Sequence, residues 1–137
     1  MKIRYIQPND YNKGYLDLLY QLSQYKSNIN YDDFKSYIDQ NKNMIIKVIE
    51  VDNKIIGAGS LFILNKIHCN PIGQIEDVVI DQNFRIQGFG KLIISNLVKE
   101  ANIYNCYKII LNSHSENYKF YKSCGFEKSG FQLKLLC

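Results

Sequence analysis

Apolar residues in the first quarter of the chain recur at the spacing of a helix. The stretch KIRYI at 2–6 alternates as a short strand does, and QPND behind it is a turn with Asp10 placed to cap a helix. The apolar positions of that helix are Tyr15, Leu18, Leu19 and Leu22. Asn30 is placed to cap a second helix, whose predicted buried side is Phe34, Tyr37 and Ile38.

The period then changes to that of strands and returns once to that of a long helix. MIIKVIEV (44–51) and IIGAGSLFIL (55–64) flank the turn DNK and predict an antiparallel hairpin. The elements predicted after it are a strand at 74–80, a helix with Phe89, Ile93, Leu97 and Ala101 on one face, a buried strand at 107–111, a helix at 118–123 and a strand at 130–136. This order predicts an α/β fold, a single domain over residues 1–137 built around one sheet.

Composition narrows the class without naming a function. The chain has 137 residues, 46% of them hydrophobic and 22% charged, with a net charge of +4. Because its lysines and arginines are scattered, we expect no nucleic-acid partner. No apolar run suits a membrane span or a signal peptide, so we expect no membrane insertion. The cysteines fall in no CxxC or metal-ligand spacing, which favours free thiols, a cytoplasmic location and no metal.

The segment FRIQGFGKL at 84–92 is the strongest candidate for chemistry. Its two glycines open a helix, where backbone N–H groups lack partners and attract anions, and Arg85 and Lys91 add positive charge. A dinucleotide fingerprint would need a third glycine where Ile93 stands, and an acid where Lys108 stands. The pattern therefore predicts a phosphate-bearing ligand of another kind.

This segment resembles the acyl-CoA-binding motif (R/Q)-x-x-G-x-(G/A) of the GNAT acetyltransferase superfamily, with Arg85, Gly88 and Gly90 in the fixed positions. GQIEDVVI, CYKIIL and FYKSCGF, at their spacings here, are similar to the glucosamine-6-phosphate N-acetyltransferase family within it. The resemblance implies the GNAT fold, with a central, mostly antiparallel sheet and flanking helices. It also implies a homodimer that moves acetyl from acetyl-CoA to the amine of glucosamine 6-phosphate, toward UDP-N-acetylglucosamine.

The resemblance also implies which residues hold the cofactor. Backbone groups of Val78, Val79 and Ile80 would pair with the pantetheine arm. The diphosphate would lie on the loop formed by Arg85, Ile86, Gln87, Gly88, Phe89, Gly90 and Lys91. Asn117 matches an asparagine that contacts the cofactor. Tyr121 matches the tyrosine whose hydroxyl lies by the thioester sulfur, where a phenol can protonate the leaving thiolate.

The acceptor side is implied in the same way. Glu76 and Asp77 would hold the sugar hydroxyls and the amine, which makes Asp77 a catalytic candidate as well. The remaining candidates for binding the acceptor substrate are Asn30, Lys66, His68, Tyr107, Lys108 and Lys134, of which Tyr107 and Lys108 match positions on the phosphate side.

The chain departs from the family pattern at three places. Ile86 stands where the family usually has a further glycine. Asn112, a candidate for both the catalytic and the cofactor-binding set, stands where relatives carry an acid, and an amide cannot accept a proton as a base does. The C-terminal KLLC lacks an arginine that relatives direct to the sugar phosphate, and Lys134 could substitute for it.

Three alternatives remain open at this point. The first is a GNAT enzyme that acetylates another small amine or a protein N-terminus. The second is a catalytically weak module that binds coenzyme A without turnover. The third is ping-pong chemistry through Cys106 or Cys124, which neither cysteine favours because no histidine adjoins it in sequence and both lie in apolar segments.

Overall fold

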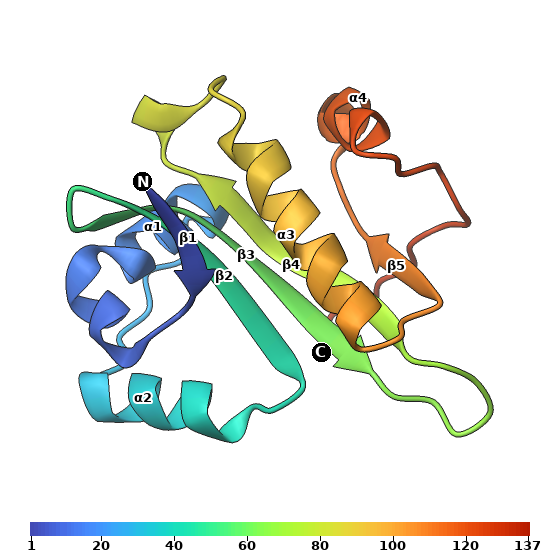
Figure 1. Ribbon diagram of the computed structural model, residues 1–137, viewed down its shortest axis with the longest axis horizontal. Coiled ribbons are helices and arrows are strands. Elements are labelled where there is room, and N and C mark those ends of the chain that lie inside the picture. The colour runs from blue at the N-terminus through green and yellow to red at the C-terminus, as the bar shows by residue number, and fades with distance from the viewer.

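The computed structural model describes all 137 residues, which fold around one five-stranded sheet (Figure 1). The strands stand in chain order across the sheet: β1 (Lys2–Tyr5), β2 (Met44–Val51), β3 (Lys54–Leu64), β4 (Ile72–Ile80) and β5 (Lys108–Leu111). The first four pair antiparallel, and β5 alone runs parallel to its neighbour β4. A parallel neighbour requires a crossover, and the long helix between β4 and β5 supplies it.

Helices cover both faces of the sheet (Figure 1). Alternate strand residues point to opposite faces, so each face has its own hydrophobic core. On one face, α1 (Tyr15–Ser23) and α2 (Tyr31–Gln40) pack Leu18 and Phe34 against the sheet. On the other face, α3 (Phe89–Ile103) packs Ile93, Ile94, Leu97 and Ala101. The short α4 (Tyr118–Ser123) follows β5.

A bulge interrupts the pairing of β3 with β4. Ala58 pairs with Val79 and Ser60 with Glu76, so Gly59 alone stands opposite both Asp77 and Val78. Asp77 takes up the extra residue in the left-handed region, at φ +54°. An inserted residue bends its strand and redirects side chains. The bulge therefore turns β4 just after the acidic pair, beside the end of β5.

Close packing at the bulge makes Gly59 sensitive to any added side chain. A Cβ there would lie 2.6 Å from Cγ2 of Ile93 and 3.0 Å from Cδ1 of Leu97, both fully buried in α3. We expect Gly59→Ala to lower the free energy of unfolding by about 1–3 kcal/mol, because a close-packed core resists added volume. Urea unfolding measures it, with Ser95→Ala on the exposed side of α3 as the control. Equal stability of the two variants would contradict the packing described here.

The structure corrects four expectations from the sequence. No strand forms at 130–136, where the chain has no regular structure. The predicted buried strand at 107–111 begins at Lys108 and is largely exposed, since it is the sheet edge. Tyr37 is 49% exposed and not part of a buried side. Asp10 does not cap α1, because its buried carboxylate accepts hydrogen bonds from Arg4 and from the Gln7 N–H within a 3-10 helix, Pro8–Lys13.

Candidate active site

The glycine segment opens α3 as its sequence predicts. Gly88 is the residue before the helix and lies at φ +86°, a conformation that side chains disfavour. No side chain caps this end, so the amides of the first turn have no side-chain acceptor. The helix dipole adds partial positive charge at the same point. The start of α3 is therefore suited to receive an anion.

Ile86 lies in the same loop in an unusual conformation. It has φ +62°, although a β-branched residue rarely adopts the left-handed region, and its side chain is fully exposed. Glycine is the residue that adopts this conformation without strain. Ile86 thus adopts a left-handed backbone conformation that is typical of glycine.

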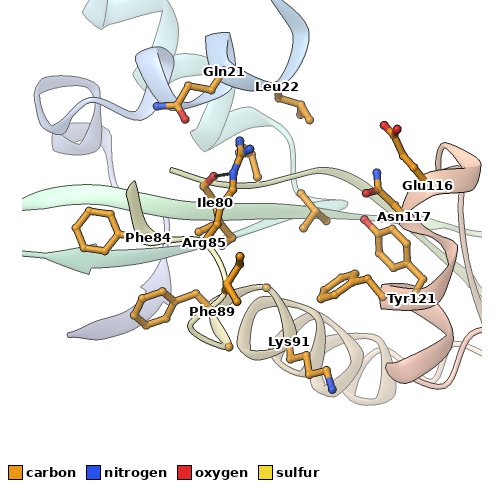
Figure 2. Close-up of a pocket in the computed structure, with 16 residues that line it drawn as sticks. Gln21, Leu22, Ile80, Phe84, Arg85, Phe89, Lys91, Glu116, Asn117 and Tyr121 are labelled. Atoms are coloured by element: carbon orange, nitrogen blue, oxygen red, sulfur yellow. Dashed lines mark hydrogen bonds between the residues drawn. The ribbon is translucent and has the colours of Figure 1, made fainter. Parts of the chain in front are cut away.

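A cavity of about 790 Å³ lies between β4, the glycine loop (residues 85–91) and α4 (Figure 2). Tyr121 and Asn117 extend into it from the side of α4, opposite Gln21 and Leu22. The expected cofactor residues that line it are Val78, Val79, Ile80, Arg85, Ile86, Gly88, Phe89, Gly90, Lys91, Asn117 and Tyr121. Two expected residues, Gln87 and Asn112, are not part of this lining.

Five lining residues were missed by the sequence reasoning: Gln21, Leu22, Phe84, Glu116 and Phe120. Gln21 and Leu22 come from α1, about 60 positions before the loop, and no local pattern connects them to it. Phe120 could have been predicted, because it adjoins Tyr121, which the sequence already indicated as a cofactor residue. Its ring lies 3.0 Å from where a Cβ of Gly90 would stand, so the second glycine permits α3 and α4 to approach.

Arg85 is directed along the loop toward the end of β4. Its Nε donates a hydrogen bond to the carbonyl oxygen of Ile80 at 3.1 Å, drawn as a dashed line in Figure 2. The remaining guanidinium nitrogens stay available to a ligand, because an arginine carries five N–H donors. The contact holds a positive charge at the rim of the cavity.

Tyr121 lies half-buried between two cavities. Its ring packs edge-on against Phe120 and Phe126, at centroid distances of 5.0 and 6.1 Å. It lines the large cavity and also a second one of about 460 Å³, which Asn112 lines as well. Burial, and to a lesser degree Cys124, raises the pKa of the Tyr121 hydroxyl. The phenol is therefore protonated at neutral pH and able to donate.

Glu76, Asp77 and Asn112 lie where the pairing of β4 with β5 ends. Neither Glu76 nor Asp77 lines the large cavity or the second one, whereas Asn112 lines the second. The parallel register pairs Ile75 with Leu111, and one further residue places Glu76 beside Asn112. Glu76 accepts a hydrogen bond from Nε2 of Gln74 at 2.6 Å. Asp77 is exposed, yet neighbouring groups partly shield its carboxyl from water; this desolvation raises its pKa, and the charge of Glu76 adds to the shift.

The raised pKa of Asp77 predicts a pH-dependent effect of its removal. When folding raises the pKa of a carboxyl group, the folded chain favours the protonated form. The resulting stabilisation is complete below the unfolded-state pKa of an aspartate, about 3.9, and is lost as the pH rises through the folded-state pKa. We therefore expect Asp77→Asn to raise the melting temperature at pH 7, with a smaller gain near pH 3. Asparagine also tolerates the left-handed backbone at this position.

Thermal unfolding at the two pH values measures this effect. Asp39→Asn, at the exposed end of α2, is the matched control. A lower melting temperature for Asp77→Asn at pH 7 would mean that the Asp77 carboxylate stabilises the folded chain, contrary to the shift described here.

The other acceptor candidates are exposed and more dispersed. Tyr107 donates its backbone N–H to the Pro71 carbonyl at 3.0 Å, which ties the loop bearing Lys66 and His68 to the start of β5. Lys108 pairs with Ile72, four positions before Glu76, or about 13 Å along the strand. The side-chain oxygen of Asn30 accepts the Asp33 N–H and caps α2, as predicted. Lys134 lies in the segment without regular structure.

The cysteines carry no sign of a nucleophile. All four are free, and burial raises the pKa of Cys106, which opposes thiolate formation. No three His, Cys, Asp or Glu side chains gather as a metal site would need. None of the helices has the length and apolar character to cross a bilayer.

Comparison with known proteins agrees with the fold. Residues 3–126 match the family model described as "Acetyltransferase (GNAT) family". The chain therefore belongs to the GNAT acetyltransferase family, and the expected GNAT fold, mixed and mostly antiparallel with flanking helices, is confirmed.

Individual relatives indicate a narrower group within this family. The chain is 34% identical to "Glucosamine 6-phosphate N-acetyltransferase 1" of Dictyostelium discoideum, over 98% of this chain and 90% of that protein. It is also 34% identical to "Glucosamine 6-phosphate N-acetyltransferase" of Arabidopsis thaliana, over 96% and 93%. The crystal structure of glucosamine-6-phosphate N-acetyltransferase from Arabidopsis thaliana superposes with a TM-score of 0.92 at 33% identity, covering 98% of this chain and 97% of that one.

Proposed function

We propose that this protein is a glucosamine 6-phosphate N-acetyltransferase, which moves acetyl from acetyl-CoA to the 2-amine of glucosamine 6-phosphate in UDP-N-acetylglucosamine biosynthesis. The observation that carries the proposal is the near full-length likeness to enzymes of that name, in sequence and in fold. Residues 1–137 act as a single domain in this proposal. The small-molecule substrates need neither nucleic acid nor a membrane.

The residues present fit acetyl-CoA, which supplies the reactive thioester when bound. The uncapped start of α3 and the bare Gly88 backbone suit a diphosphate, and Arg85 and Lys91 carry the complementary charge. The proposed cofactor set remains that of the resemblance: Val78, Val79, Ile80, Arg85, Ile86, Gln87, Gly88, Phe89, Gly90, Lys91, Asn112, Asn117 and Tyr121.

In the proposed reaction, the chain holds a neutral amine in line with the acyl carbon, and the N–C bond forms as the C–S bond breaks. The nitrogen passes its surplus proton to water, and water restores to Tyr121 the proton that it gives to the departing sulfur. Positioning of this kind supplies much of the barrier reduction in such transfers. Asp77 and Glu76 orient the amine and the sugar hydroxyls, while Tyr121 donates its hydroxyl proton to the departing sulfur. Asn112, beside Glu76, can donate or accept a hydrogen bond but cannot serve as the base.

The acceptor set proposed here is Asn30, Lys66, His68, Glu76, Asp77, Tyr107, Lys108 and Lys134. Lys108 and Lys134 are the cations offered to the sugar phosphate. Lys108 pairs with Ile72, four positions before Glu76, so a phosphate bound by Lys108 would lie along the sheet from the acidic pair.

The proposal includes a homodimer in the cytoplasm. Phe131, Leu133 and Leu135 alternate along the C-terminal segment and are between 89% and 97% exposed, a pattern that a second copy would bury. The four free cysteines suit a reducing compartment. We expect light scattering to give twice the chain mass of 16.0 kDa, and removal of residues 131–137 to give monomers. A full-length chain that is monomeric at micromolar concentration would contradict the dimer.

An acetylation assay tests the proposed function and separates it from its alternatives. The protein is mixed with acetyl-CoA and glucosamine 6-phosphate, and released thiol and acetylated sugar are both measured. The proposal predicts both products in equal amounts, and little from unphosphorylated glucosamine. Activity on other amines alone would favour a different acceptor, while coenzyme A binding without product would favour a binding module. Activity that persists in Cys106→Ala/Cys124→Ala would exclude the ping-pong route.

A further inference from the structure

A glutamine from α1 makes two hydrogen bonds to the start of the glycine loop. Nε2 of Gln21 donates to Oδ2 of Asp81 at 3.4 Å, and Oε1 of Gln21 accepts the backbone N–H of Gln82 at 3.0 Å. These are contacts between residues about 60 positions apart in the chain. Figure 2 shows Gln21 on the side of the cavity opposite α4.

Asp81 is the group through which this contact can act on the loop. It follows β4, is 2% exposed, and its backbone N–H donates to the Ile56 carbonyl at 2.8 Å. Its carboxylate accepts the Asn83 N–H at 2.9 Å and a bond from Nζ of Lys54 at 3.2 Å. Burial alone would raise the pKa of Asp81, but these donors outweigh it and the pKa is lowered.

The turn that Asp81 and Gln21 hold leads directly into the glycine loop, residues 85–91, which is proposed to bind the diphosphate and is called the diphosphate loop below. Residues Gln82–Phe84 form a single 3-10 turn, closed by the Phe84 N–H donating to the Asp81 carbonyl at 2.8 Å. Arg85 follows at once, and the loop from Ile86 to Gly88 is exposed, with two left-handed residues. The side chains that tie the backbone of this turn down are thus Asp81 and Gln21.

We propose that Gln21 is a positioning residue for the cofactor site, which acts through Asp81 and Gln82 to fix the turn that presents the diphosphate loop. The inference rests on the proposed function only for the identity of the ligand. Loss of the two hydrogen bonds leaves the chemistry at Tyr121 intact but lets the loop sample orientations that do not bind. The effect falls on affinity for coenzyme A and hardly on turnover.

Titration calorimetry with coenzyme A tests the proposal on Gln21→Met, which keeps the length of the side chain and removes both hydrogen bonds. We expect the Kd to rise about tenfold, the loss expected when about 1.4 kcal/mol of preorganisation is removed. The amides of Gln82 and Asn83 should exchange their hydrogens faster in the free protein. In turnover, the KM for acetyl-CoA should rise while kcat changes less than about twofold.

Lys54→Met separates positioning from direct contact. Lys54 touches the same Oδ2 of Asp81 but does not line the cavity, and its side chain is 56% exposed. The proposal predicts a smaller loss of coenzyme A affinity in the same direction, about threefold. An unchanged Kd in Lys54→Met beside a weakened one in Gln21→Met would mean that Gln21 touches the ligand itself and would overturn the proposal.

Two further results complete the test. Gln40→Met, at the exposed end of α2, is the control and should bind coenzyme A as the natural chain does. If Gln21→Met does not fold, Lys54→Met decides the matter through the same Kd and the same two amides. Absence of coenzyme A binding by the natural chain would refute the proposed cofactor, whereas unchanged binding in both variants would refute only the role of Gln21.

Discussion

Tyr121→Phe should lower kcat about 100-fold while the KM for acetyl-CoA changes less than about threefold. The substitution keeps the ring, and therefore its edge-on packing against Phe120 and Phe126. It removes only the hydroxyl, the group proposed to protonate the departing sulfur. The loss should therefore appear in turnover and not in binding.

Steady-state kinetics on Tyr121→Phe measures the effect, with Tyr104→Phe as control. Tyr104 lies at the end of α3, away from the cavity, and should leave kcat unchanged. The pH profile adds a second reading, because burial raises the pKa of Tyr121. A decline of kcat attributable to this tyrosine should begin only above its ordinary pKa of about 10. A kcat in Tyr121→Phe equal to that of the natural chain would remove Tyr121 from the mechanism.

The second large effect is expected at Gly88. Gly88→Ala should raise the KM and the Kd for the cofactor about tenfold or more, since an added Cβ stands between the backbone and an approaching diphosphate. The same change should lower the free energy of unfolding by about 1–2 kcal/mol, because alanine is strained at φ +86°.

Gly125 provides a matched control for that strain. It has φ +98° and, like Gly88, has no atom within 4 Å of the position that an added Cβ would take. Unlike Gly88, it follows α4 and does not line the large cavity. Gly125→Ala should therefore lose similar stability and keep its affinity for coenzyme A. Equal affinities in the two variants would mean that the Gly88 backbone is not where the diphosphate binds.

Local patterns were sufficient for the parts of the fold that depend on local forces. The apolar spacing at Ile93, Leu97 and Ala101 predicts the buried face of α3, and Asn30 predicts the cap of α2. The glycine loop was also predictable, because a left-handed Gly88 ahead of an apolar helix is a local requirement. The prediction of a strand at 130–136 was wrong. Alternation of apolar residues specifies which face of a strand is buried but not which strand it pairs with, and Phe131, Leu133 and Leu135 pair with nothing in this chain.

The site was predictable only where a motif and the chemistry coincide. The resemblance predicted Tyr121 and Asn117 as cofactor contacts, and both line the large cavity. Gln21 and Asp81 could not be predicted from the sequence. Their contact joins α1 to the end of β4, and only the folded sheet brings these segments together. The bulge at Asp77 was missed for the same reason, since it is defined by pairing with β3 and has no glycine to mark it.

We propose that the amides at the start of α3 hold the diphosphate of coenzyme A and so direct its thiol to Tyr121. A crystal structure of the protein with coenzyme A tests it most directly. We expect diphosphate oxygens within hydrogen-bond distance of backbone N–H groups between Ile86 and Lys91, with the sulfur beside the Tyr121 hydroxyl. Coenzyme A bound elsewhere, with these amides making no contact to phosphate, would contradict it.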